Sequence, residues 1–231
     1  MPFPLASRGR SPRLTPVKVL VTAGPTREPI DPVRFLTNRS SGKMGYTLAG
    51  AFVHEGHSVL LVSGPTSLDV PEGVDYIPVE TAAEMHDTVA RYIGRMDVAV
   101  FAAAVADYTP AAVQPHKIKK AGDTLTLELV RTADILGSAR EAFGFNGTLV
   151  GFAAETENLE ANAREKLVRK GCDLVIANDV SQPGIGFDSD QNQVLLVYPD
   201  RTDSLPLASK HELSMQLVDA IMAINKPVTG N

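Results

Sequence analysis

Short apolar segments alternate with segments of helical periodicity along most of the chain, and this alternation restricts the fold more than any other feature. The first apolar run, residues 17–23, ends at Gly24-Pro25 and is typical of a buried strand. Strands that alternate with helices at this spacing form a parallel sheet covered by helices on both faces. The sequence therefore predicts an α/β fold with a Rossmann-like, mostly parallel sheet. The expected strands are residues 17–23, 58–63, 98–103, 148–154, 173–177 and 193–198, with an exposed or edge strand at 124–130, and the expected helices are residues 44–54, 81–93, 133–143, 159–170 and 210–224.

Two segments depart from this alternation. Residues 1–16 carry prolines, serines and three arginines, and we expect them to be a flexible arm or the remnant of a linker. Residues 107–123 are polar and rich in lysine. They are expected to form a flap that hinges near Pro110 and Gly122. The rest of residues 17–231 is expected to form a single domain, because a chain of 231 residues that is 44% hydrophobic suffices for one large core.

Composition argues against several kinds of partner. The net charge is −5 and tryptophan is absent, so neither a basic field nor a stacking platform predicts nucleic-acid binding. No apolar run approaches the roughly 20 residues of a membrane helix, and no membrane partner is expected. The single cysteine, Cys172, cannot form an internal disulfide. It favours a reducing compartment, here the cytoplasm, and is expected to be buried and inert.

The loop after the first strand is unusually long. It runs from Gly24 to Gly42, about 19 residues, whereas strand-to-helix loops usually have about 2–6 residues. Its last residues, Ser40, Ser41 and Gly42, lead into a helix start, where hydroxyls and backbone N–H groups can surround an anion. A capped helix start without a ligand is the simpler alternative.

Neither common nucleotide fingerprint fits this loop. A Walker A motif would need glycine at Thr37 and Ser or Thr at Met44, and a Rossmann fingerprint would need glycine at Ser40. An anion site of another type is therefore expected at this helix start, in the segment from Asn38 to Gly45. Ligands of such sheets bind at the carboxyl ends of the strands, which directs attention to the other strand ends.

The later strand ends carry small and basic residues. Ala102-Ala103-Ala104 ends one strand and leaves room for a ligand, with Asp107 able to accept hydrogen bonds from ribose hydroxyls. Phe152 ends another strand and could pack on a base or in the core. The lysines of residues 116–120 and the pair Lys166 and Lys170 would by default be solvated surface, although the pair shares one helix face. The five histidines have no metal-ligand spacing, and no metal ligand is assigned.

Taken together, the segments GPTREPIDPVRFLTNRSSGKMG, AAAVADY, KIKK, GFAAET and IANDVS closely resemble the phosphopantothenoylcysteine synthetase family of coenzyme A biosynthesis. The resemblance implies a ligase that joins 4′-phosphopantothenate to L-cysteine with CTP and Mg²⁺, through an acyl-cytidylate. In bacteria such a synthetase is usually half of a bifunctional protein that also contains a flavin-dependent decarboxylase. The chain is therefore expected to be a separate synthetase or a domain of such a protein.

The resemblance also implies roles for residues at matching positions. Asn38, Arg34 and Ala104 would contact the acyl group, and Lys117 would be needed to form the acyl-cytidylate. Family members form dimers in which the partner completes the phosphopantothenate site, and the flap would cover the intermediate. The implied nucleotide contacts are Ser40, Ser41, Gly42, Ala102, Ala103, Asp107, Lys117, Ala133, Asp134, Ile135, Leu136, Phe152, Lys166 and Lys170, with Ala133 standing where the family often has proline.

Two other functions remain open from the residues alone. An NAD(P)-dependent oxidoreductase would share the fold, but the chain lacks the glycine fingerprint and any Tyr-x-x-x-Lys pair. Tight NADPH binding without CTP binding would favour it. A non-catalytic nucleotide sensor would bind CTP without turnover, and the presence of Asn38 and Lys117 argues against that role.

Overall fold

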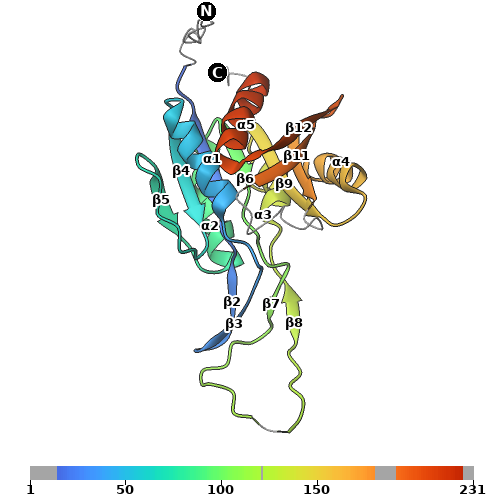
Figure 1. The fold of residues 1–231 in the computed structure, drawn as a ribbon. Helices are drawn as coiled ribbons and strands as arrows, with labels where there is room; N and C mark the ends of the chain where they lie inside the picture. Colours follow the sequence, from blue (N-terminus) through green and yellow to red (C-terminus); the bar gives the residue numbers. More distant parts are fainter. Residues whose placement is uncertain (1–14, 121, 180–190, 226–231) are drawn as a thin grey trace, which may run out of the picture.

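A computed structural model describes residues 15–120, 122–179 and 191–225. Its body is an eight-stranded sheet in the order β12-β11-β10-β9-β6-β1-β4-β5, drawn in Figure 1. The strands are β1 (Lys18–Ala23), β4 (Ser58–Ser63), β5 (Asp75–Pro78), β6 (Val98–Phe101), β9 (Thr148–Glu155), β10 (Leu174–Asp179), β11 (Gln191–Val197) and β12 (Thr202–Ser209). The predicted arm, residues 1–16, lies outside the described residues except for its last two.

The sheet is parallel from β5 to β10 and antiparallel at one edge. Strand β1 lies between β4 and β6, with Val21 opposite Leu61 on one side and Val100 on the other. Strands β10 and β11 pair antiparallel, as do β11 and β12. The predicted Rossmann-like, mostly parallel sheet is thus confirmed, and the carboxyl ends of β1, β6, β9 and β10 meet at one edge.

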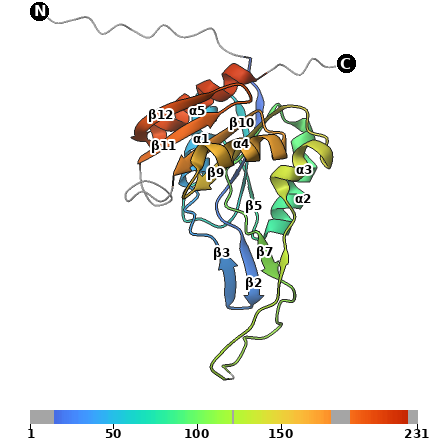
Figure 2. The same cartoon turned by 90° about the vertical axis from the view of Figure 1, so that its right-hand side faces the viewer.

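Helices cover both faces of the sheet, as Figure 2 shows from the side. Phe52 and Leu217, both fully buried, belong to a core between one face and the pair α1–α5, whereas Met85 and Leu167 belong to a core under α2, α3 and α4. No helix among the described residues is long and apolar enough to span a bilayer. The helices are α1 (Lys43–His54), α2 (Ala82–Tyr92), α3 (Ile135–Glu141), α4 (Leu159–Lys170) and α5 (Lys210–Ile224), with a 3-10 turn at Ile93–Arg95.

Local signals in the sequence set several helix ends. Thr81 accepts a hydrogen bond from Glu84 N while the Glu84 carboxylate accepts from Thr81 N, which is a capping box at the start of α2. Ser209 and Glu212 form the same arrangement at the start of α5. Helix α4 ends at Gly171 in the left-handed conformation, with φ 63°, where glycine carries no steric penalty.

Two arms extend from the carboxyl edge of the sheet, at the lower end of the molecule in both views. One is a hairpin of β2 (Arg27–Asp31) and β3 (Arg34–Thr37), formed inside the long first loop. The other is the segment between β7 (Tyr108–Pro110) and β8 (Leu129–Arg131), which pair antiparallel. The predicted flap, residues 107–123, lies in this second arm. The predicted strand 124–130 was largely wrong, because only its last two residues enter β8: a segment away from the body has no neighbouring strand to pair with.

His57 should make the stability of the fold depend on pH. It is 5% exposed, and its Nδ1 accepts a hydrogen bond from Val17 N at 3.4 Å. Burial lowers the pKa of His57, because desolvation disfavours the imidazolium. An unfolded histidine binds a proton below about pH 6.5, where the folded state stays neutral. We therefore expect the free energy of unfolding to fall as pH drops below that value.

The measurement is urea denaturation between pH 7.5 and 5.0. A His57→Gln variant should lose part of the pH dependence, whereas the variant of an exposed neighbour, His54→Gln, should keep it. An unchanged dependence in His57→Gln would contradict the assignment.

Candidate functional site

A cavity of about 630 Å³ opens at the carboxyl ends of β1, β6, β9 and β10, where ligands of open α/β sheets bind. Basic residues outnumber acidic residues six to two among those that line it, so the cavity suits a polyanion. The basic residues are Lys43, Arg131, Lys166, Arg169, Lys170 and Lys210, and the acidic residues are Asp107 and Asp134.

The start of α1 forms one side of the cavity. Gly42 precedes the helix in the left-handed conformation, with φ 78°, which glycine adopts without strain. Ser40 Oγ accepts a hydrogen bond from Gly42 N at 3.3 Å, and Ser41 Oγ accepts one from Lys43 N at 3.5 Å. All four residues line the cavity. Their hydroxyls and the first N–H groups of α1 can thus donate to a phosphate.

Gly45 allows α1 to approach the end of β1. A Cβ atom at Gly45 would lie 2.5 Å from the Cβ of Ala23, closer than packed carbon atoms can come. We expect Gly45→Ala to displace the helix start and to cost about 1–3 kcal/mol in the free energy of unfolding. Urea denaturation measures this cost. As a control, Gly94→Ala adds a Cβ with no atom within 4 Å and should leave the free energy of unfolding nearly unchanged.

The end of β6 lies in the middle of the cavity edge. Ala102 N donates to Thr22 O at 3.1 Å, and Ala104 N donates to Gly24 O at 2.9 Å, so the segment continues along β1 beyond the last paired residue. Ala102, Ala103 and Ala104 line the cavity, and the exposed Asp107 follows them. The small side chains of these alanines leave space for a ligand in the cavity. The Asp107 carboxylate, at the edge of the cavity, can accept hydrogen bonds from that ligand.

Helices α3 and α4 form the opposite wall. Asp134 Oδ1 caps α3 by accepting from Gly137 N at 2.9 Å, and its other carboxylate oxygen forms an ion pair with Lys170. Lys166 Nζ donates to Phe152 O at 2.6 Å. Burial lowers the pKa of Lys166, since desolvation disfavours the ammonium form. All four of these lining residues, with Ala133, Ile135 and Leu136 beside them, come from positions assigned to the nucleotide by resemblance.

Asn38, Arg34 and Lys117 do not line the cavity of their own chain. Asn38 lies at its border, where its Nδ2 donates to Ala104 O at 3.1 Å and to Val105 O at 3.2 Å. Arg34 lies on the hairpin arm and Lys117 on the β7–β8 arm. Asn38, Arg34 and Lys117 therefore occupy the border and the arms, whereas Ala104, also assigned to the acyl group, lines the cavity.

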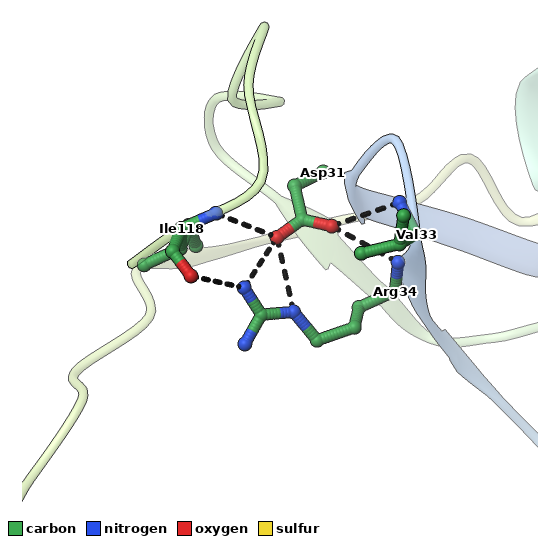
Figure 3. A network of polar contacts seen from close by, with 4 residues as sticks. All are labelled: Asp31, Val33, Arg34 and Ile118. Carbon is green, nitrogen blue, oxygen red and sulfur yellow. Dashed lines mark hydrogen bonds and ion pairs between the residues drawn. The ribbon is translucent and has the colours of Figure 1, made fainter. Parts of the chain in front are cut away.

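Asp31 joins the two arms, as Figure 3 shows. Its carboxylate accepts from Arg34 Nη2 at 2.5 Å, from Arg34 Nε at 3.0 Å and from Ile118 N at 3.1 Å. Val33 N and Arg34 N also donate to it, and Arg34 Nη2 donates to Ile118 O at 2.9 Å. The Arg34 guanidinium holds the pKa of the Asp31 carboxyl well below its usual range. The hairpin and the residue after Lys117 thus form one hydrogen-bonded unit.

Sequence reasoning missed several residues of this region. Asp31 was not assigned a role, although an aspartate three residues before an arginine in a turn is a pattern that can cap and pair locally. Arg169 and Lys210 were not assigned either, because each has the pattern of an ordinary surface residue, and Lys43 was included in the predicted anion segment without a role of its own. Only the fold shows that they face the cavity.

The cavity fits a magnesium ion carried by phosphates better than one held by the protein. No group of three potential ligands gathers in the part of the chain that the structure describes, and Asp107 is the rim carboxylate that could contact such an ion. Magnesium is often bound mainly through substrate phosphates, where it neutralises their charge.

The sheet, the helix start at its carboxyl edge and the basic cavity define a Rossmann-like protein whose cavity suits a polyanion. The model of the DNA/pantothenate metabolism flavoprotein C-terminal domain family matches residues 14–224, and the chain belongs to this family. The family resemblance found in the sequence is thereby confirmed.

Two relatives illustrate the relationship. The coenzyme A biosynthesis bifunctional protein CoaBC of Bacillus subtilis is 49% identical over 210 residues, which cover 90% of this chain and 52% of that protein. The CoaBC protein of Escherichia coli strain K12 is 46% identical over 209 residues, which cover 89% of this chain and 52% of that protein. The chain spans about half the length of these relatives.

Solved structures agree with this placement. The C-terminal domain of a CoaBC protein is 40% identical and superposes with a TM-score of 0.78, over 93% of this chain and 98% of that one. The DNA/pantothenate metabolism flavoprotein from Streptococcus pneumoniae is 25% identical, with a TM-score of 0.78 over 90% of this chain and 99% of that one. The observed fold is therefore that of the family.

Proposed function

We propose that the chain is a phosphopantothenate–cysteine ligase, which joins 4′-phosphopantothenate and L-cysteine with CTP. The observation that carries the proposal is the basic cavity at the carboxyl edge, in a chain whose relatives are named for coenzyme A biosynthesis. CTP and Mg²⁺ are part of the proposal, and the cytoplasm is the proposed location because both nucleotide and free cysteine are present there.

The proposed reaction has two steps. A carboxylate oxygen of 4′-phosphopantothenate attacks the α-phosphorus of CTP, the bond from that phosphorus to the β-phosphate oxygen breaks, and pyrophosphate leaves. The amine of cysteine then attacks the acyl carbon, loses a proton, and CMP leaves with the electrons of the acyl–oxygen bond. Basic side chains in the cavity would stabilise the charge that develops on the phosphates.

The proposed contacts with the nucleotide lie on both sides of the cavity. The start of α1, with Ser40, Ser41 and Gly42, would bind phosphate, while Asp107 would accept from the ribose. Lys166 and Lys170 would lie along the nucleoside and α-phosphate on the opposite wall. The other nucleotide contacts are proposed at Ala102, Ala103, Ala133, Asp134, Ile135, Leu136 and Phe152, which line the same cavity.

We also propose that the enzyme works as a homodimer in which each arm reaches the partner's cavity. Arg34, at the start of β3, and Lys117, between β7 and β8, are assigned to the acyl chemistry but do not line the cavity of their own chain. Large exposed apolar side chains gather on these arms, which would be covered in a dimer. They are Val33, Phe35, Tyr108, Val113, Leu125, Leu129 and Val130.

Because the relatives are bifunctional proteins, a flavin-dependent decarboxylase is the proposed functional partner.

A pyrophosphate-release assay tests the function. The chain is incubated with 4′-phosphopantothenate, each nucleoside triphosphate in turn, Mg²⁺ and cysteine. We expect release with CTP, and ligated product only when cysteine is present. Absence of release with every nucleotide would refute the ligase, and tight NADPH binding in its place would indicate an oxidoreductase.

A further inference from the structure

Glu28 is a buried carboxylate to which the proposed reaction gives no role. It is the second residue of β2 and is 3% exposed. Glutamate is almost never buried to this degree unless its carboxylate has a partner. Glu28 Oε1 accepts a hydrogen bond at 2.9 Å from the backbone N–H of Ala82, the first residue of α2. A side chain of the hairpin arm thus binds the start of a helix that lies 54 positions further along the chain.

This contact completes the capping of α2. The helix caps itself through Thr81, which accepts from Glu84 N, and through Glu84, which accepts from Thr81 N. The N–H of Ala82 is one of the first N–H groups of a helix, which have no acceptor within the helix itself. Ala82 is 1% exposed, so its N–H would be buried and unpaired without Glu28, which is costly. A carboxylate is also favoured at the positive end of the helix dipole.

Backbone contacts place the root of the hairpin, residues 26–28, between two parts of the body. Arg27 N donates to Glu80 O at 2.8 Å, on the side of α2. Thr26 N donates to Ala104 O at 3.3 Å, and Thr26 Oγ1 accepts from Ala106 N at 3.0 Å. The hairpin root therefore lies between the start of α2 and the connection after β6, and Glu28 supplies its side-chain contact with α2.

Asn38 is connected to Glu28 through the pairing of the two hairpin strands. Glu28 lies opposite Leu36, and Arg27 lies opposite Thr37. Asn38 is the next residue, so its backbone position follows that of β2. Its side-chain amide donates to two carbonyl groups of the connection after β6 at 3.1 and 3.2 Å. A small displacement of the hairpin root would therefore move this amide group relative to the cavity.

We infer that Glu28 is a positioning residue for the second step of the proposed reaction. It holds β2 against the start of α2, and the pairing of β2 with β3 passes that position on to Asn38. This inference rests on the proposed ligase function, in which the Asn38 amide stabilises the oxyanion formed by attack of the cysteine amine. Loss of the contact between Glu28 and Ala82 should therefore slow the transfer to cysteine more than the formation of acyl-cytidylate.

Three substitutions of Glu28 test the contact. Glu28→Met keeps the length of the side chain and removes the acceptor, so we expect ligated product to form about 10- to 100-fold more slowly, as misplacement of a reacting group can cause. Acyl-cytidylate should accumulate in this variant. Glu28→Gln keeps an acceptor oxygen at the same place and should restore most of the rate. Glu28→Asp, one methylene shorter, should resemble Glu28→Met and serves if that variant does not fold.

Glu84→Met is the matched control, because Glu84 caps the same helix from its exposed side without contact with the hairpin strands. It should lower the free energy of unfolding, as Glu28→Met does, and leave the rate of ligated product unchanged. Urea denaturation of each variant gives the loss of stability. Quenched reactions with radiolabelled CTP give the amounts of acyl-cytidylate and product.

A nuclear magnetic resonance measurement follows the position of Asn38 without any reaction. The side-chain N–H signals of Asn38 are assigned in the labelled chain by their disappearance in Asn38→Asp. We expect these signals to shift in Glu28→Met and to stay in place in Glu84→Met and Glu28→Gln. A merely structural role of Glu28 in capping α2 would not produce this difference.

Four outcomes would overturn the inference. These are unchanged product formation in Glu28→Met, an equal loss in Glu84→Met, an equal loss in Glu28→Gln, and acyl-cytidylate formation that falls as far as product formation. Asn38 signals that shift as expected, in a chain that releases no pyrophosphate with any nucleotide, would refute the ligase function. The placement of Asn38 by Glu28 would then still stand, so the two failures are distinguishable.

Discussion

Replacing Asp31 with asparagine is expected to slow acyl-cytidylate formation by at least about 100-fold, the loss that a misplacement of about 1 Å can cause. Asp31 holds the Arg34 guanidinium through two hydrogen bonds and also accepts from Ile118 N, beside Lys117. Asparagine keeps the size but has one acceptor oxygen and no charge, so it cannot satisfy this set of donors. Because the nucleotide cavity lies elsewhere, CTP affinity should stay within about 3-fold.

Asp173→Asn is the matched control. Asp173 also pairs with an arginine, Arg140, at 2.7 Å and accepts from Leu149 N at 2.8 Å, but it lies just before β10, outside the cavity lining. The Asp173→Asn substitution should lower the free energy of unfolding and leave the rate of acyl-cytidylate formation unchanged.

Hydrogen exchange adds a readout that is independent of activity. The backbone amide of Ile118 should exchange faster in Asp31→Asn and remain protected in Asp173→Asn. Equal rates of acyl-cytidylate formation in Asp31→Asn and the unaltered chain would show that the link between the arms has no part in the reaction.

Asn38→Asp is expected to reduce ligated product by about 100- to 1,000-fold, the range found when a donor to a developing oxyanion is removed, and to accumulate acyl-cytidylate. The Asn38 Nδ2 donates to two carbonyl groups, those of Ala104 and Val105. A carboxylate at this position would repel both oxygens, and it has no N–H that could turn from these carbonyls to the oxyanion formed when the amine attacks. The residues proposed to bind CTP are unchanged in this variant, so acyl-cytidylate should still form.

Lys117→Gln provides the opposite result. It removes the charge proposed for the first step, so acyl-cytidylate should not form and pyrophosphate release should fall with it. Radiolabelled CTP and chromatography of quenched reactions distinguish the two variants. Equal amounts of trapped intermediate in both would refute this division of roles between Asn38 and Lys117.

Much of the body could be predicted from the pattern of residues. The predicted bounds of α4, α5 and β4 agree with the structure, because each has a regular apolar period and clear end signals. The hairpin of β2 and β3 was missed, because its sequence contains Pro29, Pro32 and polar residues, which are typical of a loop. Strand β12 was missed for a related reason: it is an edge strand with mostly exposed residues and Pro206 within it.

The cavity was predicted in part. Ser40, Ala102, Asp107 and Phe152 lie far apart in the sequence, and they line one cavity because the carboxyl ends of parallel strands converge on one edge. Lys210 was not predicted because a lysine at a helix start gives the same pattern whether it faces solvent or a cavity.

The pattern of residues was enough to predict the alternation of strands and helices in the body and the mostly parallel sheet. The anion site at the start of α1 stays a prediction. Periodicity and end signals carry this information because they record burial along a single element. The packing of the folded chain was needed to show that Asp31 contacts Ile118, that the start of α5 at Lys210 lies beside α1, and that Arg34 and Lys117 do not line the cavity of their own chain. Such contacts depend on how separate elements pack against one another, and a pattern within one element does not encode that packing.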